Sequence, residues 1–398
     1  MHPTKHIFLR FLPVFLLLFI LLLIPSRESQ AGFDHTPDSR QVPPKVILLI
    51  PEGRRGTALS KTAMSCFNAL SEKNGVEMVP LFVKTGTSGD VKSFESIPDL
   101  LNTDGAAVAI SLLRGPDVSR LYDVSGKIGI PLLMVWSEMI PLESKDHPAL
   151  FSLDFPDTFR ASAIASWAYG TERGNWSMFI DHLDARSRKM GKLSSKALSE
   201  KDLDFRTTEV LRNNPDGFVN FTEKCLSCGS KNILSWLSPS DTLKLQQTLR
   251  SLGSSGIKLI YGGEKNDMLL KSNGITVFSQ EPFAGNDIRS HTDRHILSEL
   301  GDQVELSEFI KIKTALSWVF QALATYMDGT RPADDNLSSC LRNTERISVN
   351  GFLTELSPQM HRPLRKAVYI LESENGKWTK RDRIYVEYSG TGCSIADQ

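Results

Sequence analysis

The chain has 398 residues; Lys and Arg together number 46, as do Asp and Glu, so the formal net charge is zero. This balance, with no basic stripe, argues against nucleic acid as a partner. Hydrophobic residues make up 40% of the chain, which indicates a globular fold, and a chain of this length predicts two lobes rather than one core.

Residues 1–31 have the features of an export signal. Basic residues precede the uncharged apolar run FLPVFLLLFILLLI (11–24), and small residues follow it, up to Ala31. The run is shorter than the ~20 residues that a membrane-spanning helix needs. We therefore predict cleavage after Ala31, with an uncleaved anchor as the alternative. No Cys follows the run, so a lipid anchor is not expected, and residues 32–44 are predicted to be a flexible leader.

The next part of the chain alternates between strands and helices. Four apolar runs predict strands buried on both faces, namely KVILLI (45–50), MVPLFV (78–83), AAVAI (106–110) and PLLMVW (131–136). A helical pattern that starts near Leu59 and ends at Gly75 separates the first two runs.

The alternation then starts again. Helices are expected at about 157–170, 184–202, 241–253 and 307–327, and strands at WSMFID (176–181), NILSWL (232–237), KLIYGG (258–263) and GITVFS (274–279). GFLTEL, KAVYILE and RIYVEY predict further strands near the C-terminus. This order implies an α/β fold of two lobes, each with a mostly parallel sheet, whose ligands collect at the carboxyl ends of the strands. The cleft between the lobes is the expected site.

Several segments, in order, resemble the type I periplasmic solute-binding proteins, above all those for branched-chain amino acids and amides. They are GAAVAISLLRGPDVSRLYDVSGKIGIPLLMVWSE (105–138), ALFSLDFPDTFRASAIASWA (149–168), NWSMFIDHLDARS (175–187), LRSLGSSGIKLIYGGE (249–264), ALSWVFQALATYMDG (315–329), and VNGFLTEL with KAVYILESENGKW. The resemblance covers roughly residues 45–386.

The resemblance implies two Rossmann-like lobes, three interlobe crossovers and a ligand cleft between the lobes. Lobe 1 would comprise residues 45–153 plus about 284–348, lobe 2 residues 154–283 plus about 349–388, and a tail residues 389–398. It also implies a periplasmic monomer that captures a small amino-acid-like, amide or carboxylate ligand by hinge closure and delivers it to the membrane permease of an ABC transporter. A ligand-sensing or envelope-regulatory module on the same fold is the alternative.

In lobe 1, the resemblance places two strand-end loops at the ligand. Family members bind a carboxylate through Ser or Thr and backbone N–H groups at a helix start, a favourable place for an anion. Here that loop carries Arg114 and Gly115; Arg114 could bind a carboxylate bidentately or lie on the surface. In the next loop Ser137 matches the family's small polar residue, and Trp136 is either a cleft wall or core.

In lobe 2, the resemblance points to three further positions. His182 lies where family members carry a Tyr-Gly pair, and it could replace that hydrogen bonding together with Asp184, although a helix cap explains Asp184 equally well. Trp236 could form an aromatic lid. Glu264 matches the acidic residue that meets a ligand ammonium group.

Catalytic and cofactor motifs are not found. HTDRH (291–295) has the i, i+4 spacing of two metal ligands but lacks the Glu of a zinc protease and a marked third ligand, so a polar surface turn is expected. KTGTSGD (84–90) lacks the Lys-Ser/Thr ending of a phosphate loop. We therefore predict no enzyme activity, no metal and no cofactor.

Cys225 and Cys228 form a C-x-x-C pair, which could belong to a zinc site, a redox dithiol or a disulfide. No second pair supplies the remaining zinc ligands, and the pair is predicted to lie in a polar connection rather than at the start of a helix. In an oxidising compartment such a pair is expected to close into a disulfide. Cys340 and Cys393 are expected to form a second one, and Cys66 a buried free thiol.

Overall fold

The computed structural model describes residues 43–71, 75–85, 94–103, 105–137, 147, 149–154, 157–171, 174–203, 205–210, 215–254, 256–280, 288, 290–328, 336–349, 352–357, 361–388 and 393–396. The predicted export signal, nearly all of the leader and most of KTGTSGD lie outside these residues. Within them, no helix is both long enough and apolar enough to cross a membrane.

Lobe 1 is built on sheet A, five parallel strands in the order β2-β1-β3-β4-β5. Its strands are β1 (Lys45–Pro51), β2 (Glu77–Val83), β3 (Ala106–Ser111), β4 (Leu132–Met134) and β5 (Leu150–Ser152). Its helices are α2 (Arg54–Ser71), α4 (Ile97–Thr103), α5 (Pro116–Ser125), α10 (His291–Leu300), α11 (Leu306–Met327) and α12 (Leu337–Arg342), with the 3-10 turn η3 (Gly301–Gln303).

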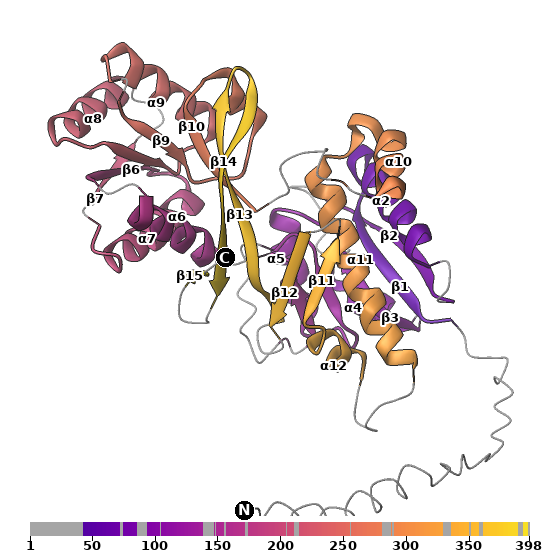
Figure 1. Ribbon diagram of the computed structural model, residues 1–398. Coiled ribbons are helices and arrows are strands. Elements are labelled where there is room, and N and C mark those ends of the chain that lie inside the picture. The colour runs from indigo at the N-terminus through magenta and orange to yellow at the C-terminus, as the bar shows by residue number, and fades with distance from the viewer. Residues whose placement is uncertain are drawn as a thin grey trace, which may run out of the picture. The chain divides into compact units, whose positions relative to one another are not determined.

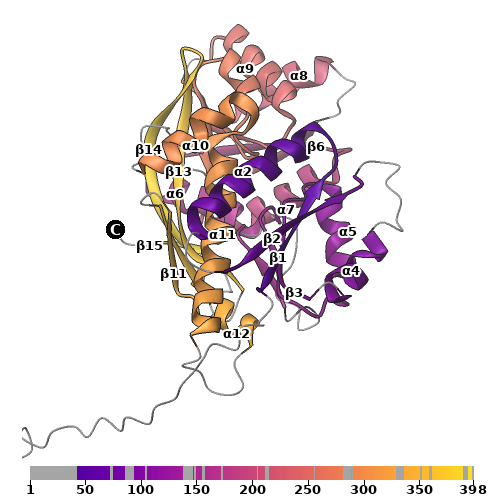
Figure 2. The ribbon, with the colours of Figure 1, turned by 90° about the vertical axis from the view of Figure 1, so that its right-hand side faces the viewer.

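Both faces of sheet A are covered, which explains why its strands are continuously apolar. In β1, Val46, Leu48 and Ile50 pack in a core cluster with α2 and α11, while Ile47 and Leu49 pack in a second cluster with α4 and α5. Helices α2, α10 and α11 lie side by side although more than two hundred residues separate α2 from the others (Figures 1 and 2).

Lobe 2 is built on sheet B, a mixed sheet whose central strands are parallel. Its strands are β6 (Trp176–Asp181), β7 (Phe205–Val210), β8 (Asn232–Ser235), β9 (Lys258–Tyr261), β10 (Ile275–Ser279), β11 (Arg346–Val349), β12 (Phe352–Ser357), β13 (Arg362–Glu374), β14 (Lys377–Tyr388) and β15 (Cys393–Ala396). Its helices are α6 (Asp157–Thr171), α7 (Ala185–Ser199), α8 (Pro215–Ser227) and α9 (Pro239–Ser251), with the 3-10 turn η1 (Asp267–Lys271).

Helices again cover both faces of the parallel part. Helices α6 and α7 share one core cluster with the sheet and α8 and α9 share the other (Figure 1). The C-terminal strands β11 to β15 pair antiparallel. Strand β13 joins them to the parallel part through β10, while Ile347 and Val349 of β11 pack in the core cluster of α2 and α11.

The predicted α/β fold of two lobes is confirmed, and several elements differ from the prediction. HTDRH (291–295) was expected to be a surface turn, but it opens α10, because Ser290 caps the helix by accepting a hydrogen bond from the backbone N–H of Asp293 at 3.3 Å. Strands β5, β7 and β11 and helices α8 and α12 were not predicted.

The cysteines also differ from the prediction. Cys225 lies in the last turn of α8 rather than in a loop. The predicted disulfide is not present, since Cys225 and Cys228 are free thiols and Cys228 Sγ accepts a hydrogen bond from Arg206 Nη1 at 2.7 Å. Cys66 is a buried free thiol, as predicted. The side chain of Cys393 lies outside the described residues, so its pairing with Cys340 stays a prediction.

Candidate functional site

The sequence-predicted site residues follow the carboxyl ends of parallel strands in both sheets. Arg114 and Gly115 come after β3, and Trp136 and Ser137 come after β4. In lobe 2, His182 follows β6, Trp236 follows β8 and Glu264 follows β9. This is the sheet edge at which open α/β folds bind ligands.

Arg114 and Trp136 are in direct contact. The guanidinium carbon of Arg114 lies 3.7 Å from the centroid of the Trp136 ring, in a cation–π arrangement. Gly115 between β3 and α5 has φ of 57° and ψ of −132°, a conformation that favours glycine. This turn begins α5 and directs the chain away immediately after Arg114.

Arg114 shares a buried carboxylate with a second arginine. Both Arg114 and Arg55 form ion pairs with Oε1 of Glu308, a residue in the first turn of α11. The Glu308 side chain is only 4% exposed, whereas those of Arg55 and Arg114 are 47% and 39% exposed. Two cations on one anion leave this cluster, the lobe 1 charge centre, with a formal excess of one positive charge.

A cavity of about 590 Å³ lies beside this centre, lined by Arg54, Arg55, Thr57, Ala58 and Gln303. It is next to the N-terminus of α2, where unpaired backbone N–H groups add positive potential. Positive side chains and a helix N-terminus together favour a negatively charged ligand group on this part of lobe 1.

Ser137 lies beneath this surface, in a buried polar network. Its backbone N–H donates to Asp154 Oδ2 at 2.9 Å, and its hydroxyl bonds with the hydroxyl of Ser152. Asp154 Oδ1 in turn accepts a hydrogen bond from Lys311 Nζ of α11 at 2.9 Å, in an ion pair with both partners buried. Ser137 therefore ties the loop after β4 to the lobe core.

In lobe 2, Glu264 pairs with a cation that sequence reasoning missed. Arg160 of α6 forms an ion pair with Glu264 Oε1 and also donates to the carbonyl of Gly262. Here the arginine is buried, at 7% exposed, and the carboxylate is 40% exposed. This pair is the lobe 2 charge centre, and it presents its negative partner to solvent.

Trp236 is core rather than surface. Its Nε1 donates to Ser194 Oγ at 3.1 Å, and a Cβ atom placed on Gly262 would meet the Trp236 ring at 2.7 Å. Nearby Tyr261 is buried, and burial raises the pKa of its hydroxyl although the charges of Arg160 and Arg186 lower it. Tyr261 therefore stays protonated at neutral pH and can act as a hydrogen-bond donor.

His182 is exposed, and its backbone carbonyl accepts a hydrogen bond from Arg188. Asp184 caps α7 by accepting from the backbone N–H of Ser187 at 2.9 Å, which confirms the helix-cap interpretation. Among the residues that the structure describes, no group of three or more His, Cys, Asp and Glu side chains could hold a metal ion.

Sequence reasoning missed Arg55, Glu308 and Arg160. Glu308 had a detectable signal, since Glu305 and Glu308 have the spacing of a capping box at the start of α11. Arg160 is a cation among small apolar residues on a largely buried helix, and a buried arginine in such a position is expected to pair with a carboxylate.

No protein-family model matches the sequence, and no curated protein matches it. Solved structures do match. A protein ascribed to a branched-chain amino acid ABC transporter of Rhodospirillum rubrum has a TM-score of 0.70 at 14% identity, covering 85% of this chain and 99% of that one. A solute-binding protein of an ABC transporter of R. palustris, in complex with benzoate, has a TM-score of 0.62 at 14% identity, covering 86% and 96%.

A third structure is the branched-chain amino acid transporter substrate-binding protein of Streptococcus pneumoniae in complex with isoleucine. Its TM-score is 0.61 at 15% identity, and the match covers 89% of this chain and 100% of that one. These structures span nearly the whole described chain, and they are ligand-binding proteins of transporters. The chain therefore has the fold of the type I periplasmic binding proteins.

Proposed function

We propose that the chain is an extracytoplasmic solute-binding protein of an ABC importer, which captures a small carboxylate ligand by hinge closure. The observation that carries the proposal is the lobe 1 charge centre, an excess cation beside an aromatic ring at the carboxyl ends of β3 and β4. The match in fold to transporter binding proteins supports it.

Arg114 is the group that we expect to bind the ligand carboxylate. Its planar guanidinium has five N–H donors, of which one on Nη2 is used by Glu308, and the Arg114 side chain is 39% exposed, so donors remain for a ligand. The Trp136 ring and Glu308 together hold the guanidinium in one orientation, so little further ordering is needed when the ligand binds.

Glu264 supplies the complementary end. Its exposed carboxylate, supported from beneath by Arg160, can accept a hydrogen bond from a ligand ammonium, amide or hydroxyl group. The proposed ligand therefore carries a carboxylate for lobe 1 and a donor for lobe 2. Isoleucine and benzoate, the ligands of two of the matching proteins, share the carboxylate, and of the two only isoleucine has a donor, its ammonium group.

The N-terminal apolar run supports export, which would place the mature protein in the periplasm as a monomer that meets a membrane permease. A solute-binding protein passes its ligand unchanged to a transporter, so we infer no catalytic role for the strand-end residues.

Ligand binding can be tested by a thermal-shift screen of purified protein with isoleucine, benzoate, 4-hydroxybenzoate and acetamide. A specific binder at about a hundredfold excess over its dissociation constant adds roughly 2.7 kcal/mol to the free energy of unfolding. Arg114→Ala should abolish most of that gain. The control Arg346→Ala removes an exposed cation from β11, away from the strand-end loops, and should leave the gain in stability intact.

If no small carboxylate stabilises the protein, or if Arg114→Ala binds as well as the parent, the proposed site is wrong. Uptake of a labelled ligand by cells with and without the gene then separates transport from sensing. A ligand that binds tightly but enters both strains equally would indicate the sensing role.

A further inference from the structure

Helix α7 of lobe 2 has the highest density of positive charge among the helices that the structure describes. Helices α8, α9 and α10 each mix both signs, and the whole chain has a formal net charge of zero. The charge of α7 is therefore a local excess. Its sequence, ARSRKMGKLSSKALS, has no acidic residue and five cations, which are Arg186, Arg188, Lys189, Lys192 and Lys196.

The lysines of α7 lie on its outer face. Lys189, Lys192 and Lys196 are at positions i, i+3 and i+7, the spacing of a single helix face, and all three are exposed. The balanced composition did not predict a basic stripe, but the helix gathers these residues into one, here called the α7 lysine row. The opposite face is buried and consists of Ser187, Met190, Gly191, Ser194, Ala197 and Leu198.

The ion pairs of the α7 lysine row do not cancel its charge. Lys189 pairs with Asp157 at 2.8 Å, but the Asp157 side chain is 5% exposed and that of Lys189 is 49% exposed, so the pair presents its positive member. Lys196 and Glu200 are 3.8 Å apart and both exposed, and such a pair contributes little. The row therefore faces solvent as a positive surface.

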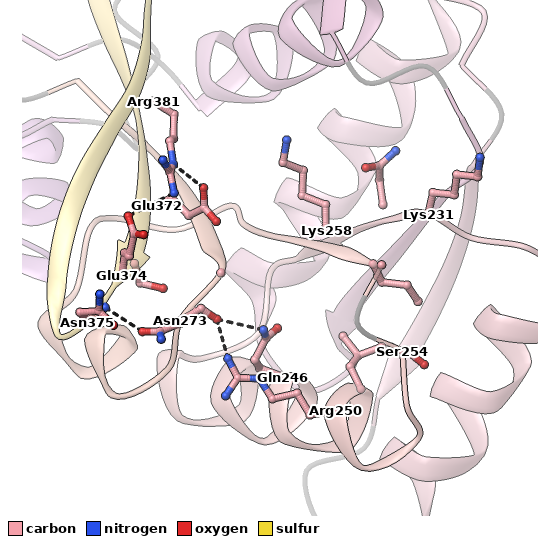
Figure 3. Close-up of a pocket in the computed structure, with 16 residues that line it drawn as sticks. Lys231, Gln246, Arg250, Ser254, Lys258, Asn273, Glu372, Glu374, Asn375 and Arg381 are labelled. Carbon is pink, nitrogen blue, oxygen red and sulfur yellow. Dashed lines mark hydrogen bonds and ion pairs between the residues drawn. The ribbon is translucent and has the colours of Figure 1, made fainter.

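Cations elsewhere in lobe 2 have fixed partners inside the protein. In the cavity drawn in Figure 3, Arg381 pairs with Glu372 at 2.6 Å and with Glu374 at 3.2 Å, and Arg250 donates to the backbone carbonyl of Asn273 at 2.8 Å. These contacts use the charge of the arginines within the fold. The α7 lysine row differs, because its ammonium groups face solvent.

An exposed aromatic side chain lies near the C-terminal end of α7. Tyr169 of α6 is 47% exposed, and the ammonium of Lys201, just past α7, lies 6.0 Å from the centroid of its ring. Helices α6 and α7 are neighbours over one face of sheet B (Figure 1). Tyrosine is typical of the boundary between lipid and water, where its ring is buried and its hydroxyl stays hydrated.

The chemistry of this surface suits lipid headgroups. Lysine has a compact charge on a flexible stem and no fixed fork geometry, so it fits a diffuse anionic surface rather than one precise partner. Clustered lysines with an aromatic residue beside them are typical of helices that lie against anionic membranes. We propose that the α7 face, formed by the α7 lysine row, Lys201 and Tyr169, docks on anionic phospholipid at a membrane surface.

The α7 face is separate from the proposed ligand site. Asp184, the cap of α7, follows the carboxyl end of β6, whereas Lys192 and Lys196 lie about two and three turns further along the helix. Docking on lipid would hold the protein beside a membrane-bound partner and goes beyond ligand capture. The test for lipid and the test for ligand can therefore fail independently.

Cosedimentation with vesicles tests the proposal. Residues 32–398, the predicted mature chain, contain the whole compact unit that begins at Pro43, with the cores of both lobes, so they fold without the apolar run. One set of vesicles contains equal amounts of phosphatidylglycerol and phosphatidylcholine, and the other contains phosphatidylcholine alone. We expect binding to the anionic vesicles at low salt, binding at least about tenfold weaker to the neutral ones, and release at about 0.5 M salt.

Lys192→Gln/Lys196→Gln should weaken binding to the anionic vesicles about 25-fold, since each cation near an anionic membrane contributes about fivefold. The matched control Lys61→Gln/Lys224→Gln removes two exposed lysines from α2 and α8 and should bind as the parent does. All four lysines lie on the surface, so folding is preserved. Tyr169→Ser should weaken binding to vesicles but not to poly-L-glutamate, because only a lipid surface takes up the ring.

Three results would overturn the proposal. One is an affinity for the anionic vesicles below about 10³ M⁻¹, a tenth of that of a single myristoyl chain. Another is an equal loss of binding in the control variant, which would indicate attraction by overall charge rather than by α7. The third is an equal effect of Tyr169→Ser on vesicles and on poly-L-glutamate, which would indicate an acidic protein as the partner.

Discussion

The two charge centres use the same kind of ion pair with opposite burial. In lobe 1 the carboxylate of Glu308 is buried and its arginines, Arg55 and Arg114, are exposed. In lobe 2 the arginine, Arg160, is buried and the carboxylate of Glu264 is the more exposed partner. An ion pair presents the charge of its outer member, so the two strand-end surfaces have opposite signs, as the proposed ligand with a carboxylate and a donor requires.

The pairs beneath the surfaces differ as well. Lobe 1 holds the buried pair Asp154–Lys311 below Ser137, whereas the pair Asp157–Lys189 that joins α6 to α7 in lobe 2 has a half-exposed lysine. A buried charge that loses its partner is costly. In lobe 1 both partners are buried, whereas in lobe 2 only Asp157 is, and it lies in the first turn of α6, where the helix N-terminus also stabilises a carboxylate. Lobe 1 should therefore depend more strongly on its ion pairs than lobe 2.

The largest expected effect is the loss of the buried pair. Lys311→Met leaves Asp154 buried without its cation and should lower the free energy of unfolding by about 3–5 kcal/mol. Lys189→Met, the corresponding change in lobe 2, also leaves a buried carboxylate, but Asp157 lies in the first turn of α6, where the helix N-terminus stabilises an anion, so this variant should cost less than Lys311→Met. Denaturant unfolding followed by circular dichroism measures both.

A second variant separates charge from packing. Lys311→Met combined with Asp154→Asn removes both charges, so it should recover much of the stability that Lys311→Met loses. If the double variant is no more stable than the single one, loss of packing at Lys311 rather than an unpaired carboxylate explains the cost.

Lobe 2 depends on close packing at the corresponding strand ends. A methyl group on Gly262 would meet the Trp236 ring at 2.7 Å, so Gly262→Ala should cost about 1–3 kcal/mol through overpacking. In the control Gly170→Ala, within α6, nothing lies within 4 Å of the new atom, so this variant should be about 0.5–1 kcal/mol more stable than the parent. Equal melting temperatures for the two variants would contradict the packing explanation.

Much of the fold was predictable because continuous apolar runs reveal parallel strands. The runs at 45–50 and 176–181 became β1 and β6 almost residue for residue. Strand β7, FRTTEV, was missed because its alternating polar residues resemble a loop, and α8 was missed although Pro215 supplies a helix-start signal. Helix α10 was misassigned although Ser290 and Asp293 have the spacing of a cap.

The site was less predictable because its partners come from distant parts of the chain. Arg114 and Glu308 are 194 residues apart, and Arg160 and Glu264 are 104 apart. A sequence pattern can mark a strand end, as it did for Arg114 and Glu264, but it cannot say which helix N-terminus supplies the counter-charge. Burial also decided the roles of Ser137 and Trp236, which no spacing pattern encodes.

The start of β13 offers a smaller, pH-dependent test. His361 has φ of 53°, its ring stacks on Phe151 of lobe 1, and its carbonyl accepts a hydrogen bond from Ser152 at 3.0 Å. Burial lowers the pKa of His361, as do the charges of Arg342 and Arg362, although a hydrogen bond to the Leu150 carbonyl raises it. The folded state therefore binds its proton less readily than the unfolded state does.

Because the pKa of His361 is lower in the folded state, protonation of this residue favours the unfolded state. The protein therefore has its full stability above the unfolded pKa of about 6.5 and loses stability as the pH falls below that value. His361→Asn keeps a residue that tolerates positive φ and removes the titration. Between about pH 7.5 and 5.5 its stability should fall less than that of the parent in denaturant melts. Parallel pH profiles would show that His361 does not contribute.

The last prediction concerns how fast the thiols of the two lobes react with a labelling reagent, and it involves no change in stability. Cys66 of α2 is fully buried, and burial raises the pKa of its thiol to about 12, so almost no thiolate is present at neutral pH. Cys228 is partly exposed with Arg206 on its Sγ, while Cys225 beneath it is buried and its pKa is raised by that burial. Maleimide labelling followed by mass spectrometry should modify Cys228 first, Cys225 slowly and Cys66 only after denaturation. If Cys66 in the native protein were labelled as fast as Cys228, the core of lobe 1 would have to open readily. Lobe 1 would then be the less stable lobe, although its ion pairs are the more deeply buried.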